Sequence, residues 1–194
     1  MGWQLPGRRG NMSHGKGPLM ARLLSSSERD EASRVFAIGL RHEAIRVHEG
    51  VRWTSTLARL HARLRGLPPP SANAITLGNH VYMPTPLDTS PARLEAGDLN
   101  DMGWLIHELT HAWQFQHAGW AYLAQALGEQ MRLGPKAYDY GGEAGLRAAH
   151  AAGHGLSHFM REQQADMARD YYFALKRGRD VSAWQPYMLE MRAA

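Results

Sequence analysis

The chain of 194 residues contains no cysteine. This absence excludes a disulfide framework and any metal site built from thiolates, so a metal ion would have to be held by His, Asp or Glu. No apolar run approaches the length needed to span a bilayer, and Arg8 and Arg9 are not followed by the apolar stretch of an ordinary signal peptide. We therefore expect no membrane span and no export through an ordinary signal peptide.

Charge of one sign is not concentrated anywhere along the chain. The net charge is +4 and the sequence pI is about 9.6, but the arginines are spread out and form no dense basic run with interleaved aromatics. This distribution argues against nucleic acid as the partner. Hydrophobic residues make up 44% of the chain and charged residues 21%, which favours a folded globular domain over global disorder.

The order of predicted elements indicates the fold class. Residues 1–20 are rich in glycine and lack periodicity, which is typical of a flexible leader or linker, so we place the folded domain at residues 21–194. We predict helices over residues 25–40, 54–65, 101–117, 122–131, 159–176 and 182–192, and strands over residues 45–48 and 72–83 with a turn at Gly78-Asn79. This order predicts an α+β fold, in which a small sheet packs against a mainly helical half.

Two segments between these elements are predicted to be irregular. Pro84, Pro86 and Pro91 argue against regular structure up to residue 98, after which residues 98–101 offer N-cap side chains for the following helix. Residues 135–155 contain five glycines, so we expect a long, partly irregular segment there.

The helix predicted from residue 101 carries His107-Glu108-Leu109-Thr110-His111, an HExxH pattern. At this spacing the two histidines stand one turn apart on one face, so both imidazoles can bind one zinc ion. Zinc lowers the pKa of a bound water to about 7. Glu108 can take the proton from that water and pass it to a leaving amine, which makes Glu108 the expected general base.

A catalytic zinc ion needs a third protein ligand. His117 stands where a metzincin carries its third histidine, but Gln114 occupies the position of the glycine that would break the helix, so we reject His117. We prefer Glu162, which shares a helix face with Asp166 in the segment EQQAD. Glu162 can bind the metal while Asp166 accepts the distal N–H of a ligand histidine.

Some roles at this site have more than one candidate residue in the sequence. Glu143 is a weaker substitute for Glu162. A side chain that stabilises the oxyanion is also expected. Its candidates are Tyr138, Tyr140, His150, His154, His158 and Tyr171. Residues 75–83 could form the edge strand along which an extended substrate pairs its main chain.

These residues also carry a resemblance to a known family. The segments ITLGNHVYM (75–83), LIHELTHAWQ (105–114) and EQQAD (162–166) resemble the Vgr-related metallopeptidase domains, which are similar to the toxic C-terminal extension of VgrG spike proteins of type VI secretion. The resemblance covers residues 26–178. It implies a zincin-like fold of the gluzincin type, with zinc on His107, His111 and Glu162, Glu108 as base and Asp166 behind a ligand histidine.

The same resemblance implies a biological role. It suggests an antibacterial effector that is delivered by a type VI system and cleaves a protein or peptide in the target periplasm. A secretion spike and a cognate immunity protein would then be partners. Two alternatives remain: a non-catalytic zincin-fold module of a contractile injection system, and a DNA-associated minimal zincin protease.

Overall fold

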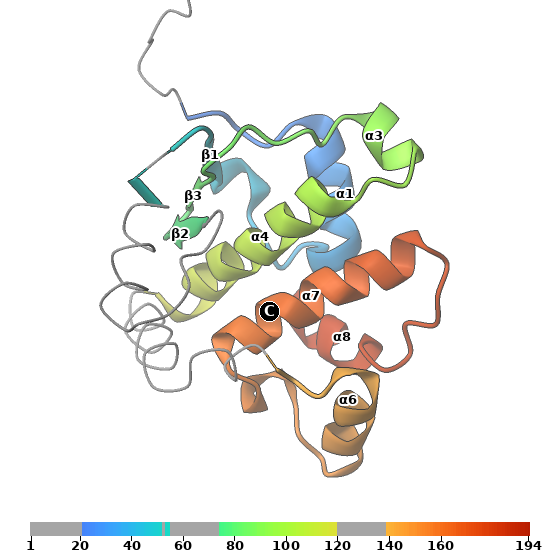
Figure 1. The fold of residues 1–194 in the computed structure, drawn as a ribbon. Helices are drawn as coiled ribbons and strands as arrows, with labels where there is room; N and C mark the ends of the chain where they lie inside the picture. Colours follow the sequence, from blue (N-terminus) through green and yellow to red (C-terminus); the bar gives the residue numbers. More distant parts are fainter. Residues whose placement is uncertain (1–20, 52, 55–73, 120–138) are drawn as a thin grey trace, which may run out of the picture.

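The computed structural model describes residues 21–51, 53–54, 74–119 and 139–194 (Figure 1). The expected leader and the helix predicted over residues 122–131 lie outside the described residues. So does the helix predicted over residues 54–65, apart from its first residue.

The described elements are mostly helical. The helices are α1 (Ser26–Phe36), η1 (His42–Ala44), α3 (Pro91–Glu95), α4 (Asn100–Ala118), α6 (Gly142–Ala151), η3 (Leu156–His158), α7 (Arg161–Lys176) and α8 (Gln185–Ala193). The strands are β1 (Arg46–His48), β2 (Ile75–Leu77) and β3 (His80–Tyr82). This is the predicted α+β class with a small sheet.

The sheet is mixed, with strand order β1-β3-β2. β1 runs parallel to β3, whereas β2 and β3 form an antiparallel hairpin. The hairpin turns at Gly78, whose φ of 63° lies in the region that favours glycine, as the sequence predicted. Among the described strands β2 lies at the sheet edge, and it is the strand that contacts α4 most extensively.

Helix α4 is the central element of the molecule. It lies between the sheet and α7, and α4 and α7 run side by side (Figure 1). The apolar residues Leu105, Leu109 and Ala112 recur at helical spacing and are fully buried. A Cβ atom built at Gly103 would come within 2.2 Å of the Phe173 ring, so the glycine allows the close approach of α4 and α7.

Helix α1 begins as predicted but ends earlier. Ser25 and Glu28 form a capping box, in which each side chain bonds the other residue's backbone N–H. The helix ends at Phe36 because Ala37 adopts a positive φ of 48°. The predicted helix to residue 40 is therefore too long, and Ile38, which follows the helix end, is 90% exposed.

Two predicted irregular segments contain helices. Pro91 begins α3 at its first turn, where the missing N–H of proline has no helical partner to lose. Within residues 135–155, α6 is bounded by glycines with positive φ, Gly141 before it and Gly153 after it, so those glycines mark the helix ends. Within residues 98–101, Leu99 occupies the N-cap position of α4 without a side-chain bond, and Asp98 Oδ1 accepts a hydrogen bond of 3.3 Å from the N–H of Asn100, the first residue of the helix.

None of the helices in the described ranges combines the length and the apolar character that crossing a membrane requires.

Candidate metal centre

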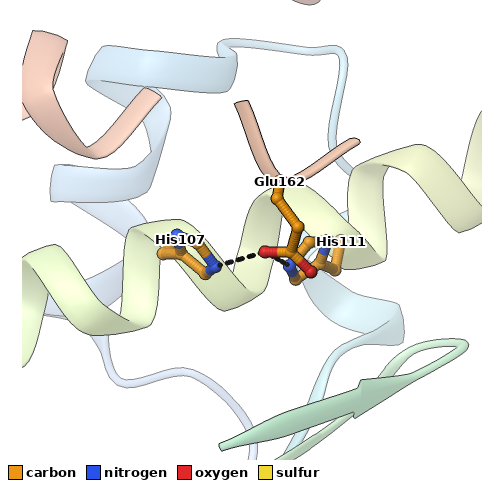
Figure 2. Close-up of side chains that lie close together, drawn as sticks. All are labelled: His107, His111 and Glu162. Carbon is orange, nitrogen blue, oxygen red and sulfur yellow. Dashed lines mark ion pairs between the residues drawn. The ribbon is translucent and has the colours of Figure 1, made fainter. Parts of the chain in front are cut away.

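Three side chains from two helices meet between α4 and α7. His107 and His111 lie one turn apart on α4, and Glu162 reaches them from the first turn of α7 (Figure 2). A Glu162 oxygen, Oε2, lies 3.3 Å from His107 Nε2 and 3.5 Å from His111 Nε2. One ligand atom from each residue lies within 4.8 Å of the others, so the group could hold a metal ion.

These separations suit a small tetrahedral cation. With zinc–ligand bonds of about 2.0–2.1 Å, neighbouring ligand atoms of a tetrahedron lie about 3.3–3.4 Å apart. The Glu162 contacts of 3.3 and 3.5 Å match that edge length. They are longer than most N–H···O hydrogen bonds, which span about 2.7–3.2 Å. Two imidazole nitrogens and one carboxylate oxygen form a donor set that zinc accepts. Three protein ligands would leave the fourth coordination position open for water or substrate.

Asp166 contacts His107, the first candidate ligand, on the ring side away from Glu162. Its Oδ1 lies 2.9 Å from His107 Nδ1, one turn along α7 from Glu162. Arg169 in turn places its Nη1 2.7 Å from the same carboxylate oxygen. A carboxylate can only accept here, so it holds the hydrogen on Nδ1 and leaves the Nε2 lone pair of His107 for a cation.

Gln114 contacts His111, the second candidate ligand, a role that the sequence does not predict. Its Oε1 lies 2.9 Å from His111 Nδ1, and its side chain is completely buried. The signal that could have indicated this contact is the separation of three residues on one helix, which places both side chains on neighbouring positions of the same face.

Glu108 lies on the side of α4 that faces the sheet. Its carboxylate accepts a hydrogen bond from Thr76 Oγ1 at 2.8 Å, and the two residues are each 5% exposed. Thr76 is the central residue of β2, so the edge strand is tied to the expected base. Sequence reasoning placed a strand here but missed Thr76, because strand alternation does not say which element faces the strand.

The charges of the centre are strongly coupled. Burial lowers the pKa of the His107 imidazole, but Asp166 and Glu162 outweigh this effect and raise it well above its ordinary value. Burial also raises the pKa of the Glu162 carboxyl, and the imidazoles of His111 and His107 overcome this and lower it far below its usual range. The Glu162 carboxylate is therefore ionised and surrounded by groups that bind protons, an environment in which a cation would displace protons.

Comparison of the chain with protein-family models, with curated proteins and with solved structures finds no match. The resemblance to Vgr-related domains therefore depends on the residues themselves.

The alternative ligands lie elsewhere. Helix α4 continues without a break past His117, whose Nδ1 lies 2.8 Å from the Trp113 carbonyl oxygen. His117 does not belong to the ligand group formed by the described residues. Glu143 is an exposed residue of α6, with its carboxylate 3.6 Å from Arg147.

The residues considered for oxyanion stabilisation have other partners. Tyr140 donates its hydroxyl to Asp170 at 2.7 Å, and the hydroxyl of Tyr171 lies 2.8 Å from Arg192 Nη2. His154 and His158 stack on each other with ring centroids 3.8 Å apart, and His150 contacts Tyr187. Tyr138 lies outside the described residues.

Proposed function

We propose that the chain is a zinc-dependent peptidase with a zincin-like fold. The observation that carries this proposal is the approach of His107 Nε2 and His111 Nε2 to the same oxygen of Glu162, at 3.3 and 3.5 Å. The HExxH spacing, the Asp166 contact behind His107 and the absence of cysteine all favour zinc over a softer or an oxygen-seeking metal.

The bound zinc ion would supply a Lewis acid, which lowers the pKa of water and polarises the scissile carbonyl. Glu108 is the proposed general base. Thr76 binds Oε2 of Glu108, which leaves the other carboxylate oxygen to take a proton from the attacking water and to return it to the leaving amine. Both proton transfers involve one carboxylate whose orientation the edge strand maintains.

An extended peptide is the proposed substrate. β2 lies at one edge of the described sheet and beside α4, where a substrate strand could pair with its main chain. The link between Thr76 and Glu108 connects this strand directly to the base. A peptide paired with β2 would therefore pass close to the catalytic carboxylate.

On the basis of the HELTHAWQ and EQQAD segments we further propose an antibacterial effector role. Delivery by a type VI system would bring the peptidase to the periplasm of a target cell, where its substrate would lie. Targeting the chain to the periplasm of a test bacterium should then inhibit growth, and the same chain kept in the cytoplasm should not. Equal growth in both cases would contradict this part of the proposal.

The peptidase proposal is tested with Glu108→Gln, which keeps the shape of the side chain but removes the base. We expect one zinc ion per chain in both proteins by elemental analysis. The wild type should cleave proteins of a periplasmic extract, and the variant should lose at least about 10²-fold of that rate, the lower range for general-base catalysis. Equal cleavage by a zinc-loaded variant would refute the role of Glu108. A zinc-loaded wild type without any cleavage would favour a non-catalytic module.

A further inference from the structure

Two buried glutamines form a path of hydrogen bonds that leads from the main chain to His111 at the candidate metal centre. Gln114 on α4 is 0% exposed and Gln164 on α7 is 2% exposed, and the two amides are in direct contact. An amide can donate or accept, so its orientation must be worked out from groups that can do only one of these. This path provides such groups at one end.

The path begins at two main-chain carbonyl oxygens, which can only accept. Gln164 Nε2 lies 3.1 Å from the Leu156 oxygen and 2.9 Å from the Phe159 oxygen. The amide nitrogen of Gln164 must therefore face these carbonyls, with both of its hydrogens used. As a result, Gln164 Oε1 is the atom that faces Gln114, and it too can only accept.

The same reasoning fixes the second amide. Gln114 Nε2 lies 2.9 Å from Gln164 Oε1 and 2.9 Å from the Arg161 carbonyl oxygen. Both neighbours are acceptors, so the nitrogen of Gln114 faces them and its Oε1 faces His111 Nδ1 at 2.9 Å. Only an Nδ1 that carries a hydrogen can satisfy this oxygen.

We propose that the path from the two carbonyls through Gln164 and Gln114 keeps a hydrogen on His111 Nδ1, so that Nε2 is the nitrogen left to bind the metal. Gln114 is thus a positioning residue for a metal ligand. The inference rests on the proposed metal centre but not on peptide cleavage.

The path also positions the third ligand. The Arg161 carbonyl that accepts from Gln114 belongs to the residue directly before Glu162. One side chain therefore fixes the orientation of His111 and the start of α7 together. An amide suits this position better than a carboxylate, because Glu108, Glu162 and Asp166 already bring three acidic groups to the centre, and a buried fourth would be costly.

The first test uses the wild-type protein loaded with zinc and labelled with ¹⁵N. Imidazole N–H signals protected from exchange are expected from both of these histidines, one for Nδ1–H of His107 beside Asp166 and one for Nδ1–H of His111 beside Gln114. A protected Nε2–H on His111 would overturn the inference. A wild type that binds no zinc would overturn the metal centre itself, and the inference with it.

The second test removes the contact with Gln114→Met, a replacement of similar length that forms no such hydrogen bonds. We expect zinc affinity, measured by competition with a chelator, to fall about 10–100-fold, the range for lost partners of ligand histidines. Only the His111 imidazole signal should disappear. Equal zinc affinity in the variant and the wild type would overturn the inference.

The matched control is Gln116→Met on the same helix. Gln116 forms a hydrogen bond to Asn79 at 2.8 Å and does not touch the metal centre. Its variant should keep wild-type zinc affinity and both imidazole signals. If Gln116→Met weakened zinc binding as much as Gln114→Met, the effect would reflect general damage to α4 and would contradict a specific role for Gln114.

Discussion

Thr76 on the edge strand donates a hydrogen bond of 2.8 Å to the carboxylate of Glu108 on α4, and both residues are buried. The same hydroxyl oxygen lies 3.2 Å from the main-chain oxygen of Glu108. The sheet and the expected base are therefore joined by one side chain. Removing that hydroxyl should therefore lower the reaction rate and leave zinc binding unchanged.

We predict that Thr76→Val lowers kcat about 10–100-fold with zinc content unchanged, because a hydrogen bond to a charged group contributes roughly 1.5–3 kcal/mol. The measurement is kcat for a synthetic peptide that contains a cleavage site identified in the periplasmic extract. Thr76→Ser keeps the hydroxyl and serves as the control, with kcat close to that of the wild type. A valine variant with the same kcat as the serine variant would contradict the positioning of Glu108.

Zinc should stabilise the wild type, since a ligand that binds only the folded state adds about 2.7 kcal/mol at 100 times its Kd. Glu162→Gln should lose most of this gain in stability, because it replaces the single carboxylate ligand with a neutral amide. Asp166→Asn should bind zinc about 10–100-fold more weakly. Thermal unfolding with and without zinc measures these changes.

Glu143→Gln is the control for these variants, because Glu143 is an exposed carboxylate on α6 that does not belong to the ligand group formed by the described residues. It should gain as much stability from zinc as the wild type. A Glu162 variant that still gained the full amount would show that another residue completes the centre.

A buried ion pair makes stability depend on pH. Glu28 is fully buried, and Arg22 donates to its two oxygens at 2.7 and 2.8 Å. Burial raises the pKa of the Glu28 carboxyl, but Arg22, the Ser25 N–H and Thr89 together lower it below its ordinary value of about 4.5. The stability that Glu28 contributes is therefore present above about pH 4.5 and is lost as the pH falls through its lower, folded-state pKa.

We predict that Glu28→Gln lowers the free energy of unfolding at pH 7 by about 1.5–3 kcal/mol, the range for hydrogen bonds to a charged group. The variant should lose less further stability between pH 5 and pH 3 than the wild type, in urea unfolding with a chelator present. Glu43→Gln, at an exposed position, should follow the wild-type curve. Parallel curves for Glu28→Gln and the wild type would contradict the role of this pair.

Gly103 and Phe173 set the contact between the two ligand-bearing helices. A methyl group at residue 103 would meet the Phe173 ring at 2.2 Å, so Gly103→Ala should lower stability by roughly 1–3 kcal/mol despite the better helix propensity of alanine. Zinc affinity should fall as well, because α7 carries Glu162. Phe173→Leu in the same protein should restore part of both losses, and additive losses in the double variant would contradict this contact.

Local features of the molecule were predictable from the sequence. The spacing of His107 and His111, and that of Glu162 and Asp166, follows from the pitch of a single helix. The capping box of α1 and the turn at Gly78 are likewise set by neighbouring residues. The glycines of residues 135–155 predict a partly irregular segment but do not indicate α6, because Gly141 and Gly153 mark the ends of a helix there.

The relationships between elements were decided only by the tertiary structure. Thr76 meets Glu108 across 32 residues of sequence, and Gln114 meets Gln164 across 50. Neither pairing follows from helix pitch or strand alternation, because both depend on how α4 packs against β2 and α7. The order of residues along the chain placed two imidazoles on one helix face. Packing at contacts such as Gly103 with Phe173 brought a carboxylate oxygen to 3.3 Å from one of them and 3.5 Å from the other.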